Sequence, residues 1–164
     1  MEGKTHIVGS LAAGALYLNL GGAVGHEALF FGSLALGALI PDIDHTGSLI
    51  GRKVPLIDNI ISTVFGHRSF THSLLFLVLA FFLFQQTSWP KDIELGILMG
   101  MFSHMVLDML TKQGVKFLWP LNIEIGIPFG IRTGGAIEQG FFTVLVIYLC
   151  YVGFHFYLSI LHIF

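Results

Sequence analysis

Charged residues are scarce in this chain of 164 residues: they make up 11% of it, against about 25% in soluble domains. The net charge is −2, which leaves no basic face for a nucleic acid and argues against a DNA- or RNA-binding module. Cysteine occurs once, at Cys150, so no disulfide can form within the chain. What the chain has instead is a hydrophobic content of 54% and a mean hydropathy of +0.81, which indicate a protein of the lipid bilayer.

Five apolar segments account for most of that hydrophobicity. A helix needs about 20 apolar residues to cross a bilayer, so the last two segments are long enough and the third is slightly short. The first two are shorter and rich in glycine and alanine, which lets helices pack closely inside a bundle. We therefore predict an all-α fold, a polytopic membrane helix bundle of about five helices that forms one integral membrane domain over residues 1–164. The predicted helices cover residues 6–20, 28–40, 71–86, 93–110 and 136–164.

Two connections between these segments are long enough to carry structure of their own. Residues 46–66 contain an apolar stretch, 56–65, with two polar residues inside it, and this pattern predicts a short amphipathic helix at the membrane interface. Residues 112–135 combine glycines and prolines with alternating β-branched or aromatic residues, which predicts a small hairpin-like insertion at the membrane surface.

The basic residues indicate how the bundle is oriented. With the N-terminus in the cytoplasm and five crossings, only Lys91 faces outward, and every other lysine and arginine faces the cytoplasm. The same topology places the motifs that combine acidic residues with histidine near the cytoplasmic ends of the helices. Because topology then gathers scattered ligand-type residues at one depth, a metal centre is the first hypothesis. The basic residues on the cytoplasmic side are Lys4, Arg52, Lys53, Arg68, Lys112, Lys116 and Arg132.

His104 and Asp108 form the simplest of these motifs. They are four residues apart on a predicted helix, so their side chains project from one face. An imidazole and a carboxylate in this arrangement can bind one metal ion or bridge two. Because an ionisable residue is costly in a membrane segment, we interpret both as metal ligands rather than as a structural polar pair.

A second motif follows Pro41, which is expected to end the second helix and begin a turn. In an extended turn Asp42 and Asp44 share a side, and both carboxylates stay ionised cheaply only with a cation nearby. Asp42 and His45 are predicted metal ligands, and Asp44 is the predicted general base that acts on activated water. The competing interpretation is that these acids only cap the helix and shape the turn.

The third motif lies at the start of the third helix, where Ser69 or Thr71 is expected to be the N-cap. Helix capping does not account for His67 and His72, so both are predicted metal ligands. Arg68 carries a planar guanidinium suited to a phosphate or carboxylate, and it is the predicted catalytic residue that grips the substrate. Arg68 is equally well explained as a cytoplasmic anchor of the helix.

Two further candidates stand alone in the sequence. A single histidine is more often a packed polar side chain, but the depth of His6 matches that of the other motifs and favours a ligand. Glu138 opens the fifth helix and is also a predicted ligand, although the helix dipole would stabilise its carboxylate without a metal. His26, His155 and His162 are predicted to be unrelated to the site. The predicted cofactor is a divalent metal, zinc, with two or more ions.

Four motifs carry a resemblance to a known family: Thr5-His6, Pro41-Asp42-Ile43-Asp44-His45, His67-Arg68-x-x-Thr71-His72-Ser73 and Ser103-His104-x-x-Leu107-Asp108-x-x-Thr111. Together they resemble the signature of the YdjM-like family of membrane-bound metal-dependent hydrolases. The resemblance implies a small inner-membrane protein of bacteria or archaea with metal-dependent hydrolase activity. The chain departs from many relatives in having Ser69-Phe70 where they have a glycine. A weaker likeness, in ligand style alone, is to zinc-dependent phospholipase C, which pairs histidines and aspartates on helices around a zinc cluster.

The predicted function is therefore hydrolysis of a phosphoester by metal-activated water. A lipid phosphoester is the expected substrate, because the site lies at head-group depth and apolar helices can admit acyl chains. The alternative is a non-catalytic metal-binding membrane protein, either a scaffold or a metal-ion carrier. A third hypothesis needs no metal, since the polar residues would only cap helices and anchor loops. The sequence does not indicate an oligomeric state.

Overall fold

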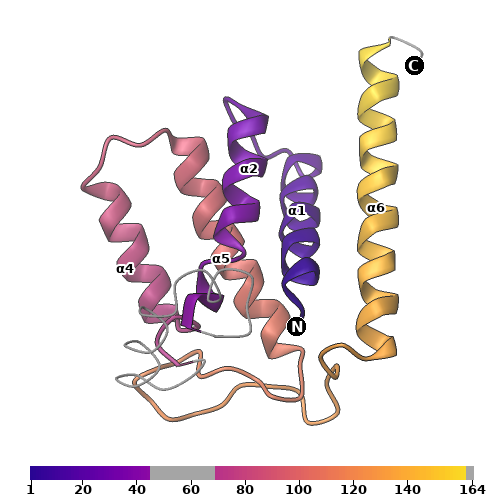
Figure 1. The fold of residues 1–164 in the computed structure, drawn as a ribbon. Helices are drawn as coiled ribbons and strands as arrows, with labels where there is room; N and C mark the ends of the chain where they lie inside the picture. The colour runs from indigo at the N-terminus through magenta and orange to yellow at the C-terminus, as the bar shows by residue number, and fades with distance from the viewer. Residues whose placement is uncertain (45–68, 162–164) are drawn as a thin grey trace.

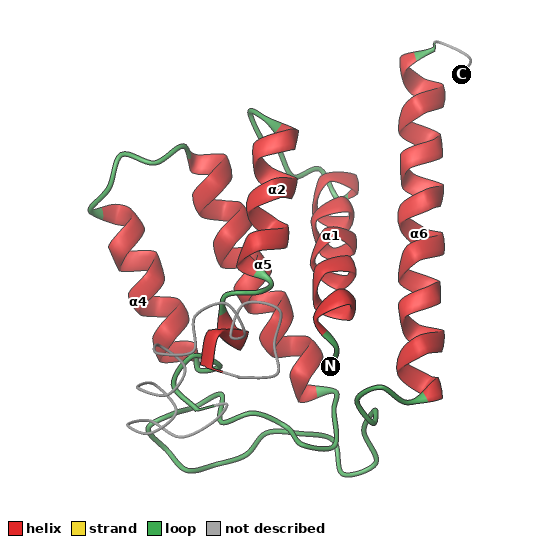
Figure 2. Cartoon of the chain, in the orientation of Figure 1, coloured by secondary structure: helices red, strands yellow, loops and turns green. Residues whose placement is uncertain are grey.

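The computed structural model describes residues 1–44 and 69–161. Within these ranges the chain is helical and contains no strand, which agrees with the predicted all-α class (Figures 1 and 2). The predicted interfacial helix at 56–65 lies outside the described residues. The described elements are α1 (Gly3–Asn19), α2 (Glu27–Gly37), the 3₁₀ helix η1 (Pro41–Asp44), α4 (Leu74–Gln85), α5 (Lys91–Met109) and α6 (Ala136–Ile160).

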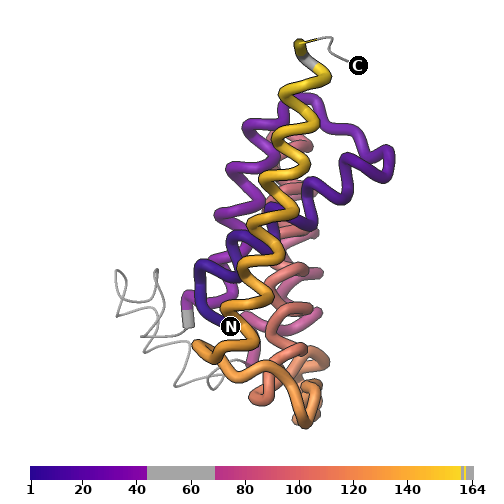
Figure 3. The backbone as a smooth tube through the Cα atoms, turned by 90° about the vertical axis from the view of Figure 1, so that its right-hand side faces the viewer, coloured from indigo at the N-terminus to yellow at the C-terminus, as the bar shows by residue number. Residues whose placement is uncertain are grey.

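The helices are arranged around α5. This helix contacts α1, α2, α4 and η1, whereas α6 contacts α1 on the far side of the bundle. Figure 1 shows α4 at one flank and α6 at the other, and Figure 3 shows the same helices turned by 90°. In both views the start of α1, the end of α5 and the start of α6 lie toward the same end of the molecule.

Glycines let α2 and α5 pack with their backbones almost in contact. A Cβ added at Gly100 would meet the carbonyl oxygen of Leu34 and, at 2.8 Å, the amide nitrogen of Ala38. A Cβ at Gly37 would lie 2.7 Å from the Cα of Ile97. Real Cβ atoms do not approach backbone this closely, so only glycine allows this packing. The prediction that small residues mark the helices inside the bundle is consistent with this contact.

One described helix is long and apolar enough to cross a membrane by length and composition. It is α6, whose segment Ala136–Ser159 has a mean hydropathy of 1.9, and none of its most apolar stretch is buried. α5 has the length, but Lys91, Asp92, Glu94 and Asp108 give it too much charge for a simple span. The predicted single-helix crossing at 93–110 is therefore not confirmed, and the polytopic arrangement stays a prediction.

The connection between α5 and α6 contains a minimal hairpin. Val115 and Ile125 form an isolated antiparallel bridge in which each amide donates to the other carbonyl, at 3.0 and 2.8 Å. The sequence predicts a hairpin-like insertion over 112–135, and this bridge lies within it. The insertion also holds the start of α4, because the amide of Leu74 donates to the carbonyl of Phe117 at 2.8 Å.

The N-cap of α4 differs from the prediction. Ser73 occupies it, and its hydroxyl accepts a hydrogen bond from the amide of Phe76 at 3.2 Å. The expected caps, Ser69 and Thr71, lie before the helix and are buried. The helix begins later than the sequence suggests because residues 71–73 form a turn that is closed by a hydrogen bond from the Ser73 amide to the Phe70 carbonyl.

Candidate metal centre

Five of the predicted ligands meet at one end of the helix bundle. They come from four separate elements: His6 from the first turn of α1, Asp42 from η1, His72 from the turn before α4, and His104 and Asp108 from the last turns of α5. Asp42 is 7% exposed and the other four are fully buried. Two three-residue groups within this cluster can hold a metal ion, His6–His104–Asp108 and Asp42–His72–His104.

Five distances between side-chain atoms describe the centre of this cluster. His72 Nε2 and His104 Nε2 are 3.2 Å apart. His72 Nε2 lies 3.8 Å from Asp42 Oδ1 and 3.6 Å from Asp108 Oδ2. His104 Nε2 lies 3.7 Å from Asp42 Oδ1 and 3.5 Å from Asp108 Oδ2.

These distances are close to the separations between ligand atoms that share one metal ion. Four ligands at about 2.1 Å from a zinc ion are separated from one another by about 3.4 Å. The five distances in the cluster range from 3.2 to 3.8 Å, and most of them are too long for direct hydrogen bonds. The two imidazoles, together with either carboxylate, therefore lie at the separations that one ion requires of its ligands.

Hydrogen bonds on the far sides of the two imidazoles set their orientation. His104 Nδ1 lies 2.6 Å from the carbonyl oxygen of Ala38, which can only accept, so Nδ1 carries the proton and Nε2 keeps its lone pair. His72 Nδ1 lies 3.1 Å from the hydroxyl oxygen of Thr71. Metal-binding histidines are typically held in this way through the nitrogen that does not bind the ion. His104 Nε2 thus faces the cluster as an acceptor, and His72 Nε2 does so when its Nδ1 donates to the Thr71 hydroxyl.

His6 and Asp108 hold buried atoms without hydrogen bonds. Neither ring nitrogen of His6 makes one with the described residues, and neither does Asp108 Oδ2. The His6 ring is stacked on His104 with ring centroids 3.6 Å apart, and its Nε2 lies 3.2 Å from Asp108 Oδ1. The amino group of Met1 donates to the same Oδ1. Buried polar atoms without partners cost free energy, and a bound cation would relieve that cost at Asp108.

The environment of Asp42 favours its ionised form. Burial raises the pKa of this carboxyl, but interactions with the His72, His104 and His6 imidazoles lower the pKa by more than burial raises it. The net effect is a pKa lowered to about 2, so Asp42 is a carboxylate throughout the physiological range. An ionised carboxylate beside two imidazole nitrogens is a suitable donor set for a divalent cation.

Glu138 is not brought into this cluster. Its Oε1 accepts from the amide of Glu2 and its Oε2 accepts from the amide of Gly134, both at 2.7 Å. These contacts tie the start of α6 to the start of α1, and they use both carboxylate oxygens on backbone groups. The geometry favours the interpretation that Glu138 stabilises the helix start over the prediction that it binds a metal.

Four other predicted site residues cannot be placed in the cluster. His45, His67 and Arg68 lie outside the described residues, and for Asp44 only the backbone, at the end of η1, is described. Their predicted roles stay predictions. The sequence analysis named Thr71 as a possible helix cap and as part of a family motif, not as a partner of the His72 ring, and it did not name the Ala38 carbonyl. Thr71 directly precedes His72 and was detectable as a partner for its ring, whereas nothing in the sequence marks the Ala38 carbonyl.

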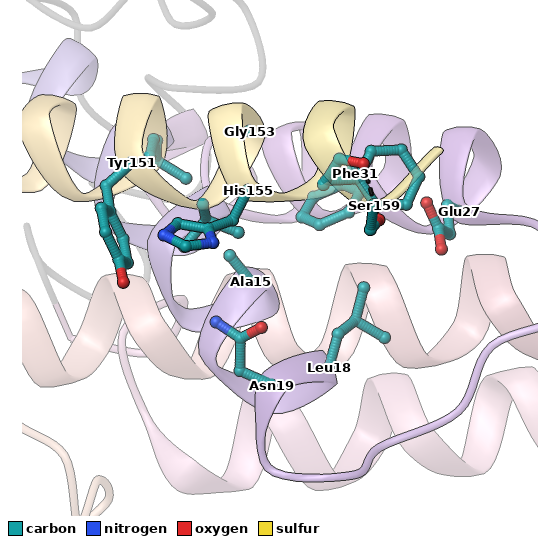
Figure 4. A pocket seen from close by; sticks show the side chains of 12 residues that line it. Ala15, Leu18, Asn19, Glu27, Phe31, Tyr151, Gly153, His155 and Ser159 are labelled. Atoms are coloured by element: carbon teal, nitrogen blue, oxygen red, sulfur yellow. Dashed lines mark hydrogen bonds between the residues drawn. The ribbon is translucent and has the colours of Figure 1, made fainter. Parts of the chain in front are cut away.

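A cavity of about 720 Å³ lies elsewhere, between α6 and the first two helices (Figure 4). Its lining includes Asn19, Glu27, His155 and Ser159 and none of the clustered histidines or aspartates. The prediction that His155 is unrelated to the site agrees with this placement.

Thr71→Val should weaken metal binding moderately. Valine keeps the shape of threonine but removes the hydroxyl that lies against His72 Nδ1, so the ring loses part of its orientation. Loss of such an outer contact typically lowers metal affinity by about 10-fold, which zinc titration against a competing chelator would measure. Thr143→Val on α6 removes a hydroxyl that bonds only the Gln139 carbonyl, and its affinity should equal that of the unaltered chain. Equal affinities for all three proteins would contradict a supporting role for Thr71.

Comparison with known proteins places the chain in a family of inner membrane proteins. The YdjM inner membrane protein family matches residues 1–160, and the chain belongs to that family. It is 44% identical to YvsG of Bacillus subtilis (strain 168) over 154 residues, which cover 92% of this chain and 93% of YvsG. It is 41% identical to the inner membrane protein YdjM of Escherichia coli (strain K12) over 113 residues, 65% of this chain and 58% of that protein.

A more distant relative is the inner membrane protein YbcI of Escherichia coli (strain K12), 33% identical over 128 residues, which cover 73% of this chain and 68% of YbcI. No solved structure matches the chain. The names of the relatives support a location in the membrane, as the composition predicted.

Proposed function

We propose that this chain is a membrane-embedded metal-dependent hydrolase that cleaves a lipid phosphoester at the cytoplasmic leaflet. The observation that carries the proposal is the buried cluster of Asp42, His72, His104 and Asp108, in which both imidazole nitrogens lie 3.2 to 3.8 Å from each other and from a carboxylate oxygen of each aspartate. The membrane location of the family and the distribution of basic residues support the choice of substrate and leaflet.

Zinc is the proposed ion. Imidazole nitrogens together with carboxylate oxygens are ligands that suit zinc, whereas calcium and magnesium prefer sites made of oxygen ligands alone. When bound, zinc supplies Lewis acidity, which makes water more acidic and stabilises negative charge on a phosphoryl group. A second ion would be held by His6 and by Asp108 Oδ1, the carboxylate oxygen nearer to His6, with His45 and His67 as the further ligands.

The chain's own residues take the remaining roles. Arg68 binds the non-bridging oxygens of the phosphoester through its guanidinium, which also stabilises the charge that grows there as the bond breaks. A carboxylate oxygen of Asp44 accepts the proton that the attacking water loses. The Thr71 hydroxyl and the Ala38 carbonyl keep His72 and His104 oriented toward the cluster.

A second candidate function is a structural metal site in a non-catalytic membrane protein. The observation that favours it is that Asp42, His72, His104 and Asp108 are buried and come from three different segments of the fold, which a bound ion would join. In that case the ion would tie η1, the start of α4 and the end of α5 together, and its removal would lower thermal stability without affecting any reaction.

The two functions separate in one experiment on the detergent-purified full chain. Elemental analysis should give at least about one zinc per chain. The zinc-loaded protein should then hydrolyse at least one of three phosphoesters: phosphatidylglycerol, phosphatidic acid or bis-p-nitrophenyl phosphate. The control is the same protein stripped by chelator, which should be inactive and should recover when zinc is returned.

Each outcome has a distinct meaning. Zinc-dependent hydrolysis supports the proposed enzyme. Zinc binding that raises the melting temperature but leaves all three substrates intact, while a reference phosphoesterase cleaves them, supports the structural site instead. Protein that retains its fold and binds no zinc contradicts both.

A further inference from the structure

An apolar groove of about 420 Å³ runs between α1 and α5, on a face that α6 does not cover. Ala13 and Tyr17 line its α1 side, and Met99, Phe102 and Val106 line its α5 side. Phe102 is 47% exposed and Val106 is 38% exposed, so the groove is open along its length to the surroundings of the bundle. In a membrane protein those surroundings are lipid.

The chemistry of the lining selects a hydrocarbon ligand. The polar side chain on its α5 side is Ser103, whose hydroxyl donates to the carbonyl of Gly100 at 3.0 Å and is therefore already used within the helix. On α5 the groove extends from Met99 to Leu107, a rise of about 12 Å. One leaflet of a bilayer has a hydrocarbon thickness of about 15 Å, so the groove has the length of a single acyl chain in one leaflet.

One end of this groove adjoins the metal centre. Leu107 is buried and lies against Gly9, where an added Cβ would be 2.6 Å from Leu107 Cδ1. Leu107 directly precedes Asp108 in the chain, and Gly9 lies one helical turn after His6. The Leu107–Gly9 contact therefore separates the end of the groove from the clustered histidines and aspartates by one layer of side chains.

We infer that the α1–α5 groove binds an acyl chain of the lipid substrate and thereby holds the head group beside the metal centre. This inference rests on the proposed function and adds to it where the lipid lies. Burial of the chain along α1 and α5 supplies binding energy at a distance from the reacting phosphoester and fixes its position, which is how enzymes use the non-reacting part of a substrate.

The test uses a phosphatidylglycerol that carries a photoreactive diazirine on one acyl chain. Zinc-loaded full-length protein in lipid nanodiscs is irradiated, and mass spectrometry locates the labelled residues. Labelling should concentrate on the groove residues of α1 and α5. Ala13→Phe fills the groove and should lower this labelling at least about tenfold, since lost burial of two methylenes is enough for that change.

The matched control is Val144→Phe on α6, a position that is 63% exposed and lines neither this groove nor the cavity beside α6, and labelling of α1 and α5 should be unchanged in it. Zinc content and melting temperature of both variants should equal those of the unaltered chain. Hydrolysis of long-chain phosphatidylglycerol should fall in Ala13→Phe, while hydrolysis of bis-p-nitrophenyl phosphate, which has no acyl chain, should not.

Several results would overturn the inference. Labelling of the groove no stronger than that of the exposed face of α6 indicates ordinary surrounding lipid. A change of oligomeric state in Ala13→Phe, with no change in labelling, indicates that a second copy of the chain occupies the groove. If Ala13→Phe hydrolyses long-chain lipid as fast as the unaltered chain does, the groove does not bind the substrate, although the proposed hydrolase function still stands. Groove-specific labelling without any hydrolysis supports the groove and counts against the proposed reaction.

Discussion

His104→Ala is expected to lower zinc affinity by more than about 100-fold, because loss of a direct ligand exceeds the 10- to 100-fold cost of losing an outer contact. His104 is the residue common to both groups that can hold an ion, and its Nε2 lies within 3.2 to 3.7 Å of three other ligand atoms. Its removal takes one ligand atom from each of these groups and leaves Asp42 and Asp108 with fewer neighbours to share an ion. Equilibrium competition with a zinc chelator, followed by elemental analysis, measures the loss.

The control for this substitution is His155→Ala. His155 is an exposed histidine on α6 in the separate cavity, and its removal should leave zinc affinity unchanged. Because His104 also bonds the Ala38 carbonyl, its loss can weaken the fold, so Asp108→Asn serves as a second variant of nearly the same shape. The asparagine side chain retains a neutral oxygen but not the charge. Unchanged zinc content in both His104→Ala and Asp108→Asn would show that the cluster does not bind the ion.

Gly100→Leu is expected to destabilise the bundle by about 3 kcal/mol or more, because overpacking of a tight interior typically costs 1–3 kcal/mol and here the obstacle is backbone. A Cβ at this position already meets the Leu34 carbonyl and the Ala38 amide. The α2 backbone must therefore move away from α5, and it carries the Ala38 carbonyl with it. Unfolding in detergent, followed by helicity, measures the change in stability, and zinc affinity should fall as His104 loses its partner.

Gly32→Leu tests whether bulk alone causes this effect. Gly32 lies on α2, the partner helix, and a Cβ there meets nothing within 4 Å. Leucine is the better helix former, so this variant should be as stable as the unaltered chain or slightly more stable. If Gly100→Leu unfolds at the same denaturant concentration as Gly32→Leu, the close α2–α5 approach does not support the fold.

Hydrophobic runs were enough to locate the described helices. Predicted segments 6–20, 28–40, 71–86 and 93–110 correspond to α1, α2, α4 and α5, with ends that differ by a few residues. Among these four helices the ends differ by at most three residues, as at the start of α4, where the turn stabilised by Ser73 delays the helix. The length of α5 agrees with the predicted segment, but because of the charges near its two ends its crossing of the membrane stays a prediction.

The candidate site was predictable in part, because some of its residues lie on one helix, where spacing in the sequence decides which side chains share a face. Helical periodicity alone places His104 and Asp108 on one face, and the structure has His104 Nε2 and Asp108 Oδ2 3.5 Å apart. Glu138 satisfied the same criteria of residue type and depth, yet its oxygens bond the amides of Glu2 and Gly134. Residue type and depth do not distinguish a ligand from a helix-start acid, because the difference lies in which backbone amides are near.

The sequence by itself determined the class of protein, the helical segments and the set of candidate ligands, imidazoles and carboxylates, near the ends of those segments. Only the tertiary structure decided which of these side chains meet, since that depends on how closely neighbouring helices approach. The glycine contact between α2 and α5 brings the Ala38 carbonyl to His104, and the turn before α4 directs His72 toward the same point. Distances between helices of this kind follow from packing of backbone on backbone, which local sequence patterns do not record.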